Sequence, residues 1–341
     1  MLILRASILT VTLLLLMGGA ARAEEAAASL DGHPVMRALL ERGRAGLNAP
    51  CAETFKDELT RMPFEEATEA AFVLKDMLDS SCRVALLGVG RESFVPLSPE
   101  QSDRELSDPA MARALDAHSH PAGNGAYFGE GGPYAGEIMF ASESAIAERR
   151  LPKELYEQAL SWVREGRIPG FNMSPPSIQD FLSAGANARY NVNAPGRVTS
   201  LVLTSGGAWT YVVDDETKAN ETLYNLVAYA NVFEAANSSA PPPRGAQSGR
   251  KERAQALFGS IAADPVSGPL VEGWAGASLA LRAPYTAEAL NRFQNGDDAG
   301  IREEAAAKQA EAERFCALLR TMGIRAAFTP RGQNLRSPLP K

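Results

Sequence analysis

Two histidines separated by one residue are the clearest candidates for chemistry in this chain. His118 and His120 flank a serine, and Pro121 follows them. In an extended strand, side chains two residues apart point to the same face, and their Cα atoms lie about 6.6 Å apart. Two imidazoles at that distance can share one metal ion, and Pro121 is expected to end the strand. The same pattern also occurs as two surface histidines beside a turn, so the pair alone leaves both interpretations open.

A second motif, Ser177-Ile178-Gln179-Asp180, follows two prolines. Ser177 at the N-cap and Asp180 at the third helical position predict a capping box that starts a helix. The same two positions share one face of a helix. Asp180 is therefore also a candidate third metal ligand, with the Ser177 hydroxyl free to bind a water or a substrate oxygen. The structural and the functional interpretation are compatible.

Taken together, the segments 118–121 (HSHP) and 176–180 (PSIQD) resemble the JAMM (MPN+) signature, which is His-x-His-Pro followed by Ser-x-x-Asp. The resemblance covers Phe64 to Val213, and it is closest to uncharacterised bacterial JAB-like domains (DUF4329-like). It implies a JAB/MPN-like α/β fold for this part of the chain. It does not extend to the C-terminal region.

The resemblance also implies an activity, since active members of the family are zinc hydrolases that cleave peptide or isopeptide bonds. Zinc would be held by His118, His120 and Asp180, which leaves the fourth coordination position open for water. Ser177 would stabilise the oxyanion of the tetrahedral intermediate. A glutamate on an earlier strand would act as the general base and then as the acid towards the leaving amine.

The chain departs from the family pattern in the spacing of the two motifs. Ser177 follows His120 by 57 residues, whereas the family gap is under about ten. The sequence therefore predicts an insert over about residues 123–173, which begins with a glycine-rich stretch. An insert beside a site is suited to forming a lid or a substrate-selecting wall.

The general base is the second departure. When the strand predicted over 83–89 is aligned with the family's glutamate-bearing strand, Cys82 falls near the expected position. Glu92 is the nearest carboxylate, and it is the preferred candidate. Glu137 is an alternative, and Glu130 lies in the same insert.

The first 23 residues predict a cleavable secretory signal. Arg5 supplies the positive charge, Ile8–Met17 is an apolar run, and Ala21-Arg22-Ala23 is a cleavage site of small residues. The apolar run is too short to span a bilayer comfortably, although an uncleaved anchor is the alternative. We therefore expect a periplasmic or secreted protein with no membrane span after cleavage.

Composition excludes several classes of protein. The 341 residues carry a formal net charge of −7, and an acidic chain without a basic stripe is not expected to bind nucleic acid. Three cysteines are too few for a disulfide scaffold. Cys51 and Cys82 could pair in an oxidising compartment, which would leave Cys316 as a buried, small apolar residue.

The patterning predicts an α/β (α+β) fold, with a mixed sheet flanked by helices, a long insert and a mainly helical C-terminal region. The JAB/MPN-like domain is expected over 24–237, followed by a linker over 238–251 and the C-terminal region over 252–341. Helices are predicted over 35–47, 64–78, 154–164, 177–188, 216–236 and 302–322. Strands are predicted over 83–89, 93–97, 198–204, 208–213 and 325–329, and residues 100–108 are predicted to form a loop.

These patterns favour an exported, zinc-dependent peptidase or isopeptidase-like hydrolase that acts on a peptide or protein substrate. The alternative is a catalytically inactive JAB-like module that binds a protein partner in the bacterial envelope. A third hypothesis, suggested by export and the same ligand set, is a zinc amidase that acts on cell-wall peptides.

Overall fold

A computed structural model describes residues 30–65, 68–90, 98–122, 150–224, 226, 263 and 267–339. The predicted signal over 1–23, the strand over 93–97 and the linker over 238–251 lie outside these residues. The helix predicted over 216–236 is described only at 216–224 and 226, where the chain is helical. Among the described helices, none has the length and apolar character needed to cross a membrane.

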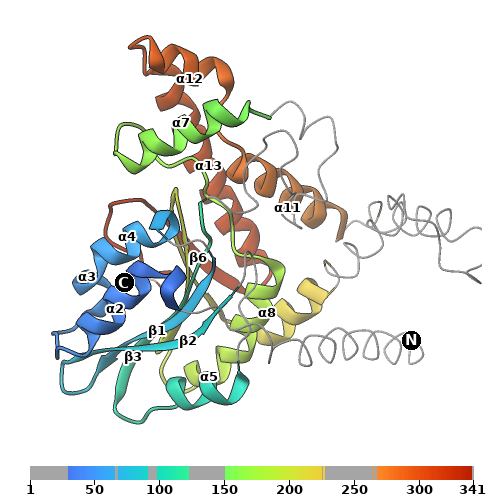
Figure 1. Cartoon of the computed structure of the whole chain (residues 1–341). Coiled ribbons are helices and arrows are strands. Elements are labelled where there is room, and N and C mark those ends of the chain that lie inside the picture. The colour runs from blue at the N-terminus through green and yellow to red at the C-terminus, as the bar shows by residue number, and fades with distance from the viewer. Residues whose placement is uncertain are drawn as a thin grey trace, which may run out of the picture.

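The described strands form one mixed sheet with the order β2-β1-β3-β4-β5-β6. Adjacent strands are antiparallel except β3 and β4, which run parallel. The strands are β1 (Ala70–Met77), β2 (Cys82–Val89), β3 (Met111–Ser119), β4 (Val198–Thr204), β5 (Gly207–Val213) and β6 (Ile324–Pro330). With helices on both faces, this confirms the predicted mixed α/β fold (Figure 1). The predicted β4–β5 hairpin and the strands that became β2 and β6 are also confirmed.

The helix predicted over Phe64–Leu78 is wrong, because most of this segment is strand β1. The preceding helix α4 (Lys56–Glu65) ends just after Phe64. The predicted apolar stripe does not share a face: Ala71 and Leu74 lie in different core clusters, and Leu78 is 70% exposed. A central strand buried on both faces has a continuous apolar run, which periodicity alone does not separate from a buried helix.

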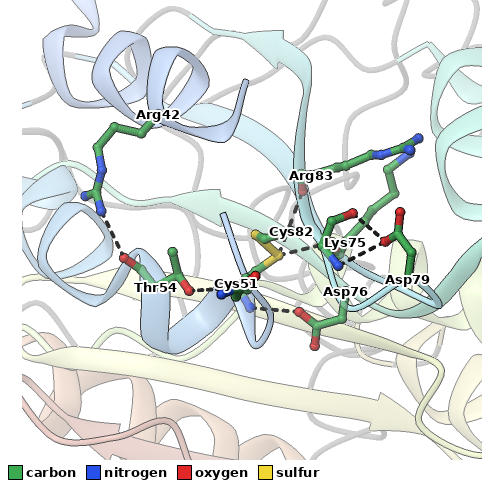
Figure 2. The surroundings of a disulfide bond; sticks show 10 residues. Arg42, Cys51, Thr54, Lys75, Asp76, Asp79, Cys82 and Arg83 are labelled. Atoms are coloured by element: carbon green, nitrogen blue, oxygen red, sulfur yellow. Dashed lines mark hydrogen bonds between the residues drawn. A yellow bond between two sulfur atoms is a disulfide. The ribbon is translucent and has the colours of Figure 1, made fainter. Parts of the chain in front are cut away.

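The N-terminal helices α2 (Pro34–Gly43), α3 (Cys51–Thr54) and α4 cover one face of the sheet. A disulfide joins Cys51 on α3 to Cys82, the first residue of β2 (Figure 2). The Cys51 amide also donates a hydrogen bond of 2.7 Å to Asp76 Oδ1. This pairing, which the sequence left open, is thus present. Closing a loop of this length stabilises a fold by about 3–4 kcal/mol through the entropy of the unfolded chain.

The C-terminal residues build the opposite face of the same sheet. Helices α8 (Ile178–Asn187), α11 (Ser267–Arg282) and α13 (Ala299–Thr321) share one core cluster with β4, β5 and β6 (Figure 1). The predicted helix over 302–322 is confirmed as α13, and Gly323 follows it with a φ of +79°, as a helix-ending glycine should. Cys316 on α13 is half-buried and has a free thiol.

Two further regions complete the fold. The predicted loop over 100–108 is wrong, because Pro99–Leu106 forms helix α5. The helix begins with an N-cap that the acidic composition of the segment obscured. The Ser98 side chain accepts a hydrogen bond from the Gln101 amide, and Pro99 occupies the first helical position. The predicted helix over 154–164 is confirmed as α7 (Lys153–Arg164), which packs beside α12 (Ala287–Gln294) at one end of the molecule (Figure 1).

Candidate metal centre

The end of β3 positions the two histidines. His118 pairs with Ala71 of β1 and with Val202 of β4, so it lies at the centre of the sheet. The His120 amide continues the ladder past the end of the strand and donates 2.8 Å to the Leu203 carbonyl. The two Nε2 atoms are 3.2 Å apart, and each side chain is 19% exposed. The backbone therefore holds both imidazoles on one face, at the end of the strand.

Helix α8 brings the third residue to the pair. The Asp180 Oδ1 atom lies 3.3 Å from His118 Nε2, and Oδ2 lies 3.9 Å from His120 Nε2. The predicted capping box is confirmed: the Asp180 amide donates 3.0 Å to Ser177 Oγ, and the Ser177 amide donates 2.6 Å to Asp180 Oδ2. The same carboxylate thus starts the helix and faces the histidines. The helix cap fixes the orientation of this candidate ligand.

The donor set fits a tetrahedral zinc ion. Ligand atoms about 2.0–2.1 Å from zinc in tetrahedral geometry are roughly 3.3 Å from one another. The two Nε2 atoms are 3.2 Å apart, Asp180 Oδ1 lies 3.3 Å from His118 Nε2, and the other Asp180 oxygen, Oδ2, lies 3.9 Å from His120 Nε2. One donor atom from each of His118, His120 and Asp180 lies within 4.8 Å of the other two. Two imidazoles and one carboxylate are donors that zinc accepts, and three of them leave a position open.

Glu69 is a fourth titratable residue at this centre, and it was not among the residues predicted from the sequence. It immediately precedes β1, and its Oε1 atom lies 4.0 Å from His120 Nε2. Its backbone is held by two hydrogen bonds: the Gly90 amide donates to the Glu69 carbonyl, and the next amide, of Ala70, donates to Ser119 Oγ. The side chain is 13% exposed. Reading β1 as a strand would have placed Glu69 at its start, in line with the earlier-strand glutamate that the resemblance implies.

Burial raises the pKa of Glu69 to about 7; the Asp180 carboxylate adds to this shift, whereas His118 opposes it. A carboxyl group with such a pKa exchanges a proton readily near neutral pH. The two carboxylates that were predicted as candidate bases, Glu92 and Glu137, lie outside the described residues, as does Glu130. Glu69 is a described carboxylate that lies beside the three candidate ligands without belonging to them.

The protonation of the two histidines differs sharply. Burial disfavours the charged form of both, but Asp180, Glu69 and the nearby Asp116 raise the pKa of His118 to about 9. Burial and the positive charge of His118 lower the pKa of His120 to about 3. Although burial opposes it, His118 holds the pKa of Asp180 well below its usual range. Without a metal, one proton therefore resides on His118, which pairs with Asp180, and His120 is neutral.

A further carboxylate, the half-buried Asp116, ties the centre to the far end of α8. It lies two residues before His118 on β3, and it accepts a hydrogen bond of 2.6 Å from Asn187 Nδ2, on the last residue of α8. Burial raises its pKa. Helix α8 is thus fixed to β3 near both of its ends, by Asp180 and by Asn187. This pairing depends on strand register and was not visible in the sequence.

Ser177, the predicted oxyanion-stabilising residue, is half-buried at the start of α8. Its hydroxyl oxygen accepts from the Asp180 amide, which leaves its hydrogen free to donate. The structure thus brings Ser177, Asp180, His118 and His120 together around the start of one helix.

Comparisons with protein-family models, with curated proteins and with solved structures found no match for this chain.

Proposed function

We propose that this chain is an exported, zinc-dependent hydrolase that cleaves amide bonds of the peptide or isopeptide type. One observation carries the proposal: His118, His120 and Asp180 converge with the separations of zinc ligands, and Glu69, with a pKa near 7, stands beside them. Zinc bound there would act as a Lewis acid and lower the pKa of a water ligand towards about 7. Export is supported by the pattern of residues 1–23 and by the Cys51–Cys82 disulfide.

The protein groups have separate roles in this proposal. Glu69 takes a proton from the attacking water and returns it to the leaving amine, which its pKa permits near neutral pH. The Ser177 hydroxyl donates a hydrogen bond to the oxygen that gains negative charge. Asp116 and Asn187 hold β3 and α8 together, so the candidate ligands stay in place.

Glu69 also bears on the choice between hypotheses. The inactive binding module was motivated partly by the lack of a strand glutamate at the position of Cys82. Cys82 instead forms a disulfide, and Glu69 provides a carboxylate at the start of the neighbouring strand β1. This arrangement favours catalysis over binding alone. The proposed substrate class includes cell-wall peptides. Release of stem-peptide fragments from purified peptidoglycan would test this substrate.

The test is the metal content of the purified chain from residue 24 to 341, measured by elemental mass spectrometry beside a His118→Ala/His120→Ala variant. We expect about one zinc per wild-type chain and none in the variant. Release of amine from a panel of peptides would then test hydrolysis. A folded wild-type protein that holds no zinc, even after zinc is added back, would overturn the proposal.

A further inference from the structure

A second cleft lies between the end of α7, helix α13 and the turn that follows β6. Its volume is about 660 Å³, which is the size of a pocket for a small molecule or a short peptide. Its lining includes none of the four residues of the candidate metal centre. The chain therefore has a cleft that the proposed hydrolytic chemistry does not use.

The charges in this cleft are unbalanced. Arg164, Arg167 and Arg331 line it, and Glu165 is the acid in its described wall. Glu165 is already engaged, because it lies 3.7 Å from Arg167 and accepts 2.8 Å from Ser161 Oγ. Within the described part of the chain, no carboxylate lies within ion-pair distance of Arg164 or Arg331. The cleft thus carries excess positive charge in a protein with a net charge of −7.

The two guanidinium groups share one aromatic ring. Arg331 lies 4.3 Å and Arg164 lies 5.9 Å from the centroid of Phe64. Arg331 also donates to the Val163 carbonyl, and Arg164 donates 3.4 Å to the Phe64 carbonyl. Backbone and ring contacts thus hold both guanidinium groups beside one ring, and the charge of Arg164 reaches Arg331. An anion that contacts both would offset this repulsion.

Arg331 shows the strain of this arrangement in two ways. Its Nε atom is buried and has no hydrogen-bond acceptor among the described residues. Burial and the charge of Arg164 together lower its pKa. An oxyanion is the partner that guanidinium groups bind best, because it accepts two parallel hydrogen bonds.

We propose that this cleft binds the oxyanion group of a ligand, either a carboxylate or a phosphate, between Arg164 and Arg331. The amides of Gln309 and Gln333 line the same cleft and offer further polar contacts. The volume leaves room for a ligand larger than the anion itself. Binding at this cleft does not depend on zinc or on hydrolysis.

The test is isothermal titration calorimetry at low ionic strength with inorganic phosphate and with succinate. It uses the metal-free His118→Ala/His120→Ala variant, so that neither anion binds at the metal centre. We expect saturable binding of one or both anions, weakened by salt. Binding of phosphate alone identifies a phosphorylated ligand, and binding of succinate alone identifies a carboxylate ligand. If neither anion binds, the inference is wrong.

Two further substitutions in the same background localise the binding. Arg164→Gln removes one exposed guanidinium and should weaken binding about tenfold, the usual loss for a hydrogen bond to a charged group. Arg44→Gln is the matched control, because Arg44 is exposed and outside the cleft and loses the same charge. It should bind as tightly as the parent variant. Equal weakening by both substitutions would show general charge attraction and would refute the site. Circular dichroism checks that both variants are folded.

Discussion

Two clusters of charged residues flank the central strands, and they differ in how their charges are balanced. On β1, Lys75 is almost fully buried and lies 2.9 Å from Glu105 and 3.3 Å from Asp108. Although burial opposes it, Lys75 lowers the pKa of Glu105; the Ala110 amide and Lys75 lower the pKa of Asp108. Both carboxylates are thus held in their ordinary charged form. This is the pattern of a structural ion pair.

The candidate metal centre shows this pattern only in part: the shifts of His118 and Asp180 favour their charged forms, whereas those of Glu69 and His120 favour their neutral forms. The pKa values of Glu69 and His118 are raised, and those of His120 and Asp180 are lowered, although these side chains lie within a few ångströms of one another. Neighbouring groups whose pKa values are driven apart mark sites of proton transfer or metal binding more often than structural pairs. The comparison teaches that burial alone does not identify a functional cluster. The direction of each pKa shift distinguishes the two.

The largest expected effect is the loss of hydrolysis when the carboxylate beside the candidate metal ligands is replaced. Glu69→Gln should retain zinc and reduce the hydrolysis rate by about 10²- to 10⁴-fold, the usual contribution of a general acid–base group. Glu105→Gln is the matched control, and it should leave the rate unchanged while it lowers stability. Amine release and zinc content measure both variants. An equal loss of rate in the two variants would show that Glu69 has no specific role in hydrolysis.

The candidate ligands could be predicted because each motif is local. The HSHP segment predicts two side chains on one face of a strand. The PSIQD segment predicts a helix that begins with a capping box. Both signals depend on residues within four positions of each other. The hairpin, α7, α13 and β6 were predicted for the same reason.

Glu69 could not be found in this way, because its place depends on strand register. The pairing of Ala71 with His118 brings the start of β1 beside His120, and these residues are far apart in the chain. The alanine-rich segment around it also fitted a helical period, which hid the strand. The hydrogen bond between Asp116 and Asn187 is a second contact of this kind, because the two residues are far apart in the chain. The register between strands that are distant in the chain is set by which face is buried, and a local sequence pattern does not predict it.

Lys75→Met tests the structural cluster. The substitution removes the buried cation beside Glu105 and Asp108 and should lower the free energy of unfolding by up to about 3 kcal/mol, the lower end of the cost of breaking a buried pair. Both carboxylates are partly exposed, which keeps the loss near that figure. Urea unfolding measures it. Zinc content should stay unchanged; if the metal is lost from a folded variant, the two clusters are coupled.

Asp180 separates its two roles when it is replaced in two ways. Asp180→Asn keeps a side-chain oxygen that can accept from the Ser177 amide, whereas Asp180→Ala removes it. Both variants should lose zinc affinity. Both also lose the ion pair with His118 in the metal-free protein, and the alanine variant should be about 1 kcal/mol less stable than the asparagine variant, the usual value of a helix cap. Equal unfolding free energies for the two would show that the capping box contributes nothing.

The last expected effect is a dependence of stability on pH that disappears when zinc is added. In the metal-free protein, the pKa of His118 is raised from 6.5 to about 9. Its contribution to stability is therefore fully present below about pH 6.5 and is lost as the pH rises through 9. Zinc must displace this proton, so the stabilisation by added zinc should instead increase over the same range. Thermal unfolding from pH 6.5 to 9, with zinc and with a chelator, measures both slopes. In His118→Ala the metal-free slope should flatten, and a slope that persists there would assign the effect to another group.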